Sequence, residues 1–127
     1  RLRAHLSAAA QSLGLRTGEG VYVCSEGPHL ESPAQIRMLR QFGDVVGMTG
    51  YPEVVLAREA ELCYASICII TNPAAGMMES QSFSASDIPL RVRRCQQDIR
   101  EIIYLAALKL DERGSCHCKE SLSGAGL

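Results

Sequence analysis

The chain has 127 residues, of which 46% are hydrophobic and 21% charged, a composition typical of one modest globular domain and not of a disordered or fibrous protein. Its formal net charge of -1 provides no basic surface, so we expect no nucleic-acid partner. The longest nearly unbroken apolar stretch, Leu62 to Ile70, is too short to cross a bilayer. We therefore expect no membrane association and a cytoplasmic location.

The first residues predict a helix that is already under way at residue 1. Its apolar residues recur at helical spacing, at Leu2, Leu6, Ala9 and Leu13, and Gly14 then ends it. Because the chain begins with Arg and not with Met, we expect it to be a piece of a longer chain.

Two short strands and two helices are predicted to alternate over the next stretch. β-branched and aromatic residues predict a strand over Gly20 to Ser25, and a second over Asp44 to Gly47. Between them, Ser32 to Gln35 has the pattern of a capping box, which predicts the start of a helix that Gly43 ends. A proline and an acidic residue in the first turn predict a further helix from Pro52 to about Glu61.

The rest of the chain predicts a buried strand, a loop and a long helix. Tyr64 to Ile70 is apolar on both alternations, which is typical of a central strand covered on both faces. Asn72 to Ser86 shows no period and predicts a loop. Residues 87–110 predict a helix whose apolar stripe we expect to pack on the sheet. Beyond it the composition turns to Gly, Ser and charge, so we expect a domain over 1–110 and a flexible tail over 111–127.

Polar side chains and a methionine follow the ends of the three predicted strands. Glu31 follows the first strand, Met48 and Thr49 end the second, and Thr71 and Asn72 end the third. In an open α/β sheet, ligands bind outside the carboxyl ends of the strands, where the loops meet and helix amino termini present free N–H groups. The sequence therefore predicts a small-molecule site formed by these residues.

Four segments of the chain resemble those of a known family. They are Glu26 to Ser32, Val46 to Thr49, Pro52 to Glu59 and Ile70 to Asn72. In this order they resemble the signature segments of the trimeric purine nucleoside phosphorylase and methylthioadenosine phosphorylase family. The resemblance implies an α/β, partial nucleoside-phosphorylase-like fold, a mixed sheet flanked by helices that lacks the amino-terminal half. It also implies a homotrimer for the full-length parent.

The activity that the resemblance implies is phosphorolysis of purine nucleosides, a pentosyl transfer in purine salvage that gives free base and ribose 1-phosphate. The partners are then a purine nucleoside and inorganic phosphate, which is a co-substrate, and no cofactor is expected. The family draws its phosphate loop, a histidine loop and a phosphate-binding arginine from the half that is absent here. We therefore expect the chain alone not to turn over inosine.

The resemblance also implies roles for individual residues. Glu31 and Asn72 match catalytic residues: a carboxylate that accepts the N–H of the six-membered purine ring, and a residue that faces the imidazole nitrogen and the exocyclic group. Donors placed against the base stabilise charge that develops on the leaving purine. Met48 matches the residue under the sugar and base, Thr49 matches a phosphate-contacting hydroxyl, and Thr71 is assigned to substrate binding.

The choice of substrate depends on position 72. An amide at Asn72 can donate to a carbonyl oxygen, whereas an ionised aspartate can only accept, so 6-oxopurines are preferred. The segments look closest to the branch that acts on 5′-methylthioinosine. A methylthioadenosine phosphorylase is the near alternative, and a non-catalytic remnant or interaction module is an alternative of another class.

Simpler interpretations of the same residues stay open. Glu31 could be a solvated acid beside a helix start, and Asn72 a common turn residue. Met48 could be a core methionine, and Thr49 a capping hydroxyl. They are weaker hypotheses because all of these residues fall at strand ends that should lie side by side.

The six cysteines divide into two groups. Those in predicted strands or on the helix stripe favour buried, reduced thiols over a disulfide framework; they are Cys24, Cys63, Cys68 and Cys95. Cys116 and Cys118, which flank His117, are too close together for the usual zinc spacing, and no second pair is near in sequence. We therefore expect no metal site.

Overall fold

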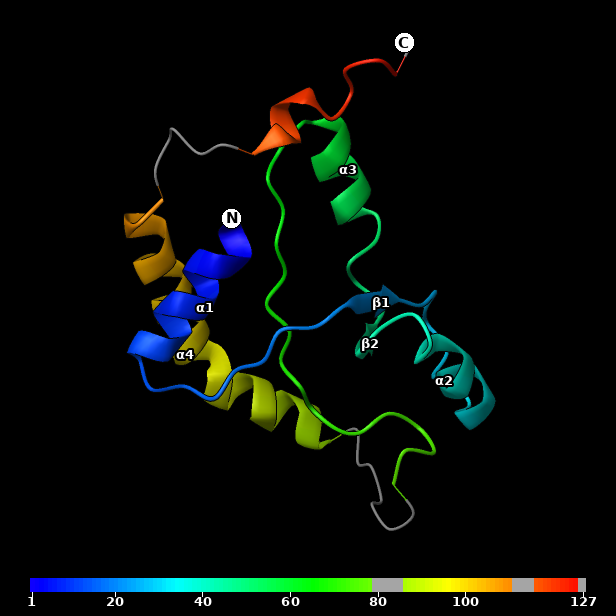
Figure 1. Cartoon of the computed structure of the whole chain (residues 1–127). Coiled ribbons are helices and arrows are strands. Elements are labelled where there is room, and N and C mark those ends of the chain that lie inside the picture. The colour runs from blue at the N-terminus through cyan, green and yellow to red at the C-terminus, as the bar shows by residue number, and fades with distance from the viewer. Residues whose placement is uncertain (79–85, 111–115, 126–127) are drawn as a thin grey trace. The chain divides into compact units, whose positions relative to one another are not determined.

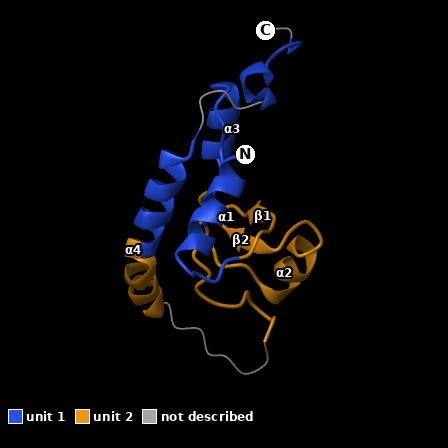
Figure 2. Cartoon of the chain, turned by 60° about the vertical axis from the view of Figure 1, so that its left-hand side comes forward, with its two compact units in different colours: residues 1–17, 51–67, 98–127 blue, residues 18–50, 68–97 orange. Residues whose placement is uncertain are grey.

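The computed structural model describes residues 1–78, 86–110 and 116–125. Figure 2 shows the two compact units into which the chain divides: unit 1 holds residues 1–17, 51–67 and 98–127, and unit 2 holds residues 18–50 and 68–97. Each unit draws on distant segments, and the long helix α4 contributes to both. The division into a domain over 1–110 and a tail over 111–127 stays a prediction.

Unit 2 is built on two short parallel strands. β1 (Tyr22–Cys24) pairs with β2 (Val45–Gly47), with Tyr22 opposite Val45 and Cys24 opposite Gly47. Parallel neighbours need a crossover connection, which α2 (Pro33–Leu39) provides in Figure 1. Both strands and the helix were predicted in this order, and all three are shorter than predicted.

The start of α2 follows directly from its sequence. The Ser32 side chain accepts a hydrogen bond from the Gln35 N–H at 3.3 Å, and the Gln35 side chain accepts one from the Ser32 N–H at 2.8 Å, which confirms the predicted capping box. Gly43 does not end this helix, because α2 stops at Leu39. A Cβ at Gly43 would lie 2.7 Å from the Val21 carbonyl oxygen, so this glycine instead permits close approach to β1.

Unit 1 contains the main core of the described chain. α1 (Leu2–Ser12) lies against the carboxyl-terminal part of α4 (Asp87–Leu108), as Figure 1 shows. Ala9 and Ala10 of α1 are buried against Ile102 and Ala106 of α4, and Leu6, Leu13, Leu15 and Leu105 surround them. Gly14 follows α1 with a φ of +70°, as predicted for a helix stop. The prediction that the long helix packs on the sheet is wrong for its buried residues, which contact α1.

The carboxyl-terminal segment is attached to α3 in unit 1. α3 spans Glu53–Glu59, and the 3-10 helix η1 spans His117–Glu120, far along the chain from α3. The Ser121 hydroxyl donates to the Arg58 carbonyl oxygen at 3.0 Å, and the Leu122 N–H donates to the Glu61 carboxylate at 3.3 Å. These two bonds join residues 116–125 to the end of α3, whereas 111–115 and 126–127 lie outside the described residues, and the flexible tail over 111–127 stays a prediction.

The predicted central strand does not form. Residues 62–70 have no regular secondary structure, and Ile70 is 64% exposed. A strand requires backbone hydrogen bonds to a neighbour, and within the described residues the sheet contains β1 and β2 alone. The segment has the apolar pattern of a buried strand, but the described residues supply no partner for it.

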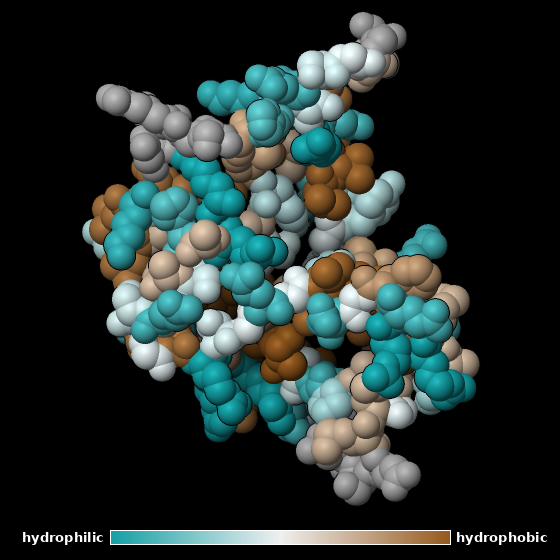
Figure 3. Space-filling view, in the orientation of Figure 1, coloured by the Kyte–Doolittle hydropathy of each residue, from teal (hydrophilic) through white to brown (hydrophobic). Residues whose placement is uncertain are grey.

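The described residues leave much apolar surface in contact with solvent. Only five hydrophobic residues are buried in this part of the chain: Ala9, Ala10, Ile36, Ile102 and Ala106. Figure 3 shows brown, apolar residues at the surface on the face in view. No helix in the described ranges is both long and apolar enough to cross a membrane.

Candidate functional site

All five predicted site residues belong to unit 2. Glu31 lies in the loop between β1 and α2, directly before the N-cap residue Ser32. Its carboxylate accepts a hydrogen bond from the hydroxyl of Ser25, the residue that follows β1. Both side chains are half-buried. The carboxylate is thus held at the carboxyl end of β1, which is where the sequence placed it.

The loop after β2 lies beside the loop after β1. A Cβ at Gly27 would lie 3.0 Å from the sulfur of Met48, so the two loops are in contact at this point. Met48 is half-buried, and Thr49 is exposed. The loops that follow the two strands therefore meet at one end of the parallel pair, through Gly27 and Met48.

Tyr22, which was not among the predicted site residues, holds the loop after β2 in place. Its hydroxyl accepts a hydrogen bond from the Thr49 N–H at 3.2 Å. Gly50 lies so close to the Tyr22 ring that a Cβ there would be 2.8 Å from Cε1, and Gly47 is closer still to the hydroxyl. The available signal was the glycine spacing on either side of Met48 and Thr49, because such glycines indicate a close approach.

Thr71 and Asn72 form a local hydrogen-bonded pair. The Thr71 hydroxyl donates to Asn72 Oδ1 at 2.6 Å, and Asn72 Nδ2 donates to the Pro73 carbonyl oxygen at 2.9 Å. An amide has two N–H donors and two lone pairs on its oxygen. Within the described residues, one N–H and one oxygen lone pair of the Asn72 amide have no hydrogen-bond partner.

The loop after Asn72 returns to the start of α2. A Cβ at Gly76 would lie 2.7 Å from Cβ of Pro33, and the Arg40 guanidinium lies 4.0 Å from the sulfur of Met77. Gly76 has a φ of +75°, which glycine adopts without strain. This loop and the loop that carries Glu31 therefore flank the same helix. Within the described residues, no hydrogen bond links Glu31, Thr49 and Asn72 to one another.

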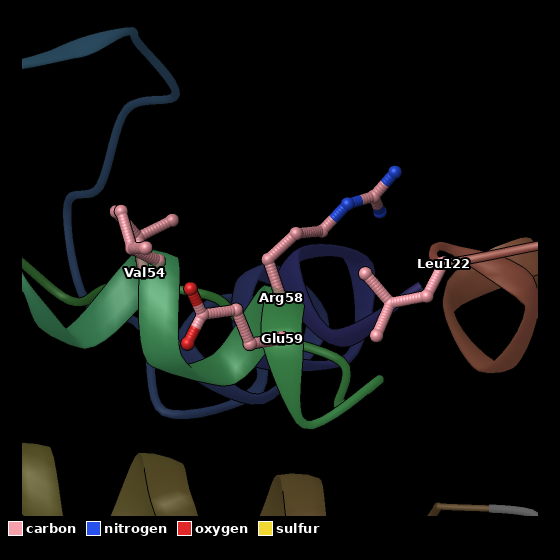
Figure 4. Close-up of a pocket in the computed structure, with 5 residues that line it drawn as sticks. Val54, Arg58, Glu59 and Leu122 are labelled. Carbon is pink, nitrogen blue, oxygen red and sulfur yellow. The ribbon is translucent and has the colours of Figure 1, made fainter. Parts of the chain in front are cut away.

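An open apolar depression lies elsewhere, in unit 1. It has a volume of about 290 Å³ and is lined by Val54, Val55, Arg58, Glu59 and Leu122. Figure 4 shows Val54, Arg58 and Glu59 on α3, with Leu122 coming from the segment after η1. None of the predicted site residues lines this depression.

A cluster of cysteines in unit 1 was not predicted. The sulfur of Cys63 lies 3.2 Å from that of Cys116, and all three sulfur atoms of Cys63, Cys116 and Cys118 lie within 4.8 Å of one another. A hydrogen bond from the backbone N–H of Cys118 is the main cause of the lowered pKa of Cys116, about 7. The pKa of Cys63 is raised to about 11, mainly by its hydrogen bond with Cys116. Either thiol of the Cys63 and Cys116 pair can donate to the other.

The other cysteines differ from the prediction of buried thiols. Cys24 and Cys68 are exposed, and Cys95 is half-buried. Cys24 lies in β1, which belongs to a sheet of two strands within the described residues. Cys68 lies in the segment where the predicted third strand does not form. Neither therefore has the cover that the prediction assumed. All six cysteines are free.

Comparisons with known proteins give a consistent result. The sequence profile of a family described as the phosphorylase superfamily matches residues 1–107. The chain is 46% identical over 126 residues to a "Probable S-methyl-5'-thioinosine phosphorylase" of Methanosarcina acetivorans, covering 99% of this chain and 48% of that protein. It is 43% identical over 126 residues to a "6-oxopurine nucleoside phosphorylase" of Pyrococcus furiosus, covering 98% of this chain and 47% of that protein. The chain thus spans about half the length of the curated relatives that it matches.

Proposed function

Because this chain belongs to the phosphorylase superfamily, we propose that it supplies the base-recognition side of an enzyme that cleaves purine nucleosides with inorganic phosphate. The observation that carries this proposal is the similarity to nucleoside phosphorylases along nearly the whole chain. The meeting of the loops after β1 and β2 adds support, because these loops carry Glu31 and Met48. The products are the free base and ribose 1-phosphate, and phosphate is the co-substrate, with no cofactor.

In the proposed reaction, phosphate attacks the anomeric carbon while the bond to the purine breaks. The sugar becomes oxocarbenium-like and the leaving purine becomes electron-rich. Glu31 accepts a hydrogen bond from the N–H of the six-membered ring, and its bond to Ser25 holds the carboxylate for that contact. Asn72 donates to the other side of the base, so the developing negative charge meets a positioned donor.

The proposed base preference is for 6-oxopurines. Asn72 has one N–H left after its bond to Pro73, so donation to both the imidazole nitrogen and the carbonyl oxygen requires the amide to release the Pro73 oxygen. The relatives named for 6-oxopurine nucleosides and for S-methyl-5'-thioinosine support this preference. A methylthioadenosine phosphorylase is the near alternative.

The remaining predicted residues receive supporting roles. We assign the exposed Thr49 hydroxyl to phosphate, and Met48 to the apolar face of the sugar and base, where its flexible thioether can adapt. Thr71 orients the Asn72 amide through its 2.6 Å hydrogen bond, which is the role that we propose for it in substrate binding. Each of these roles is separable by substitution.

The proposal extends to the complete enzyme. We propose a cytoplasmic homotrimer in purine salvage; free thiols persist in a reducing compartment, which supports the location. The chain spans about half the length of its relatives, so we expect no turnover of inosine and phosphate by the 127-residue polypeptide alone. The alternative of another class is a non-catalytic remnant or interaction module.

The test is a calorimetric titration of the 127-residue chain with hypoxanthine, with adenine as the competing base. Saturable binding of hypoxanthine that weakens in Asn72→Ala supports the base-recognition role. Gln41→Glu, an exposed polar change in the same unit, serves as the control. A flat titration with hypoxanthine would favour the non-catalytic module. Measurable phosphorolysis of inosine by the chain alone would refute our expectation of inactivity.

A further inference from the structure

Three thiols from two distant parts of the chain come together in unit 1. Cys63 lies in the segment after α3, and Cys116 and Cys118 lie at the start of η1. Cys63 and Cys116 are 53 residues apart in the chain. All three side chains are half-buried, and their sulfur atoms lie within 4.8 Å of one another. These residues lie outside the set that the proposed phosphorolysis uses.

We propose that Cys63, Cys116 and Cys118 bind one zinc ion through three thiolates. Thiolate is the ligand that thiophilic ions such as Zn²⁺ prefer, and Zn–S bonds of about 2.3 Å place sulfur atoms on a shared tetrahedral ion about 3.8 Å apart. The Cys63 and Cys116 sulfur atoms, 3.2 Å apart, are closer than that value, and no two of the three sulfur atoms are more than 4.8 Å apart. Small side-chain rotations are therefore enough to form the site.

The backbone explains how cysteines only two positions apart can share an ion. Cys116 has an extended conformation, with φ −106° and ψ 149°, and Cys118 lies inside η1. The change from extended chain to helix brings the two sulfur atoms within reach of the same point. The spacing rule that argued against a metal applies to loops that supply ligands along one stretch of chain, and it does not anticipate a third ligand from Cys63.

The fourth coordination position is assigned to water. His117 lies between two of the ligands in sequence, but its side chain is 94% exposed and its Nδ1 lies 3.4 Å from the Glu120 carboxylate. Binding through three thiolates displaces up to three thiol protons and leaves a net charge of -1 on the zinc complex.

The consequence for the fold is a stronger attachment of residues 116–125. Two hydrogen bonds, from Ser121 to Arg58 and from Leu122 to Glu61, already join this segment to the end of α3. A zinc ion would add a cross-link between Cys63 and η1 close to these bonds. Because the unfolded chain has no preformed site, zinc should stabilise the folded state.

The test is a Zn²⁺ titration of the reduced 127-residue chain in competition with a chromogenic chelator. We expect one zinc ion per chain, and thiolate-to-metal charge-transfer bands when Co²⁺ replaces Zn²⁺. Cys63→Ser should weaken zinc binding by more than about 10-fold, because even loss of a group that only supports a ligand costs that much. Cys68→Ser, an exposed cysteine in the same irregular segment, should leave the affinity unchanged.

Three results would overturn the proposal. One is the absence of zinc binding by the reduced wild-type chain. Another is equal zinc affinity in wild type and Cys63→Ser. If circular dichroism shows that Cys63→Ser does not fold, Cys118→Ser takes its place, and equal affinity in that variant overturns the proposal in the same way. The third is a combination of two measurements. A mass-spectrometric thiol count finds cysteines of this cluster in disulfides, and the reduced chain then shows no thiolate-to-metal bands with Co²⁺.

Discussion

The hydroxyl of Tyr22 accepts a hydrogen bond from the backbone N–H of Thr49 at 3.2 Å. Tyr22 is the first residue of β1 and Thr49 is the second residue beyond β2, so one side chain ties the start of one strand to the loop that follows the other. The bond leaves the Thr49 hydroxyl available, which matters for its proposed contact with phosphate.

Replacing Tyr22 with Phe should release the loop after β2. The Thr49 N–H loses its partner, and we expect the free energy of unfolding to fall by about 1 kcal/mol, the usual net value of one hydrogen bond. Urea unfolding followed by circular dichroism measures the change. Tyr51→Phe, at a tyrosine that is 64% exposed, is the matched control and should shift stability by less than about 0.5 kcal/mol. Equal stability of Tyr22→Phe and wild type would remove this role for Tyr22.

Replacing Gly43 with Ala should destabilise the parallel pair. The new Cβ would lie 2.6 Å from Cγ2 of Val23 and 2.7 Å from the Val21 carbonyl oxygen, and the backbone oxygen cannot rotate away. We expect a loss of about 1–3 kcal/mol, the usual cost of an inserted methyl in a filled space. Gly18→Ala is the control, because nothing lies within 4 Å of the Cβ that it adds. Thermal unfolding at equal heating rates compares the two, and similar melting temperatures would contradict the prediction.

Replacing Ala9 with Leu should disturb the contact between α1 and α4. Ala9 is 0% exposed in the cluster with Ile102 and Ala106, so a larger side chain has no space, and we expect a loss of about 1–3 kcal/mol. Ala8→Leu changes the adjacent, exposed position in the same helix with the same residue types. Denaturant titration should therefore show a lower midpoint for Ala9→Leu alone. Equal midpoints for both variants would mean that this contact does not form in solution.

Replacing Asn72 with Asp should change base preference in a longer protein that carries the missing half. An ionised aspartate accepts but does not donate, so it loses its contact with a 6-carbonyl and gains one with a 6-amino group. We expect the ratio of kcat/KM for inosine over adenosine to fall by at least about 10-fold, or roughly 1.4 kcal/mol. Gln41→Glu makes the same amide-to-acid change at an exposed position outside the proposed site. An unchanged ratio would remove the base-recognition argument.

Local features of the chain were predictable because their causes lie within a few residues. The capping box of Ser32 and Gln35 starts α2, and Gly14 at positive φ follows α1. The four segments that resemble the nucleoside phosphorylases were sufficient to name the family, which the match over residues 1–107 confirms. The roles of Glu31, Met48, Thr49, Thr71 and Asn72 stay predictions.

Features that depend on distant partners were not predictable from the pattern alone. Residues 62–70 have the apolar alternation of a buried strand, but a strand forms only where another backbone pairs with it, and the described chain offers none. The stripe of α4 was assigned to the sheet, whereas Ile102 and Ala106 contact α1.

The sequence by itself therefore determined the family, because four segments in order match it. It also determined the start of α2 and the order of β1, α2 and β2, because short-range sterics and hydrogen bonds decide these. Only the tertiary structure decided that Tyr22 supports Thr49 and that Cys63 joins Cys116 and Cys118. Those contacts join residues 27 and 53 positions apart, and the path of the chain between such residues depends on packing that no local pattern encodes.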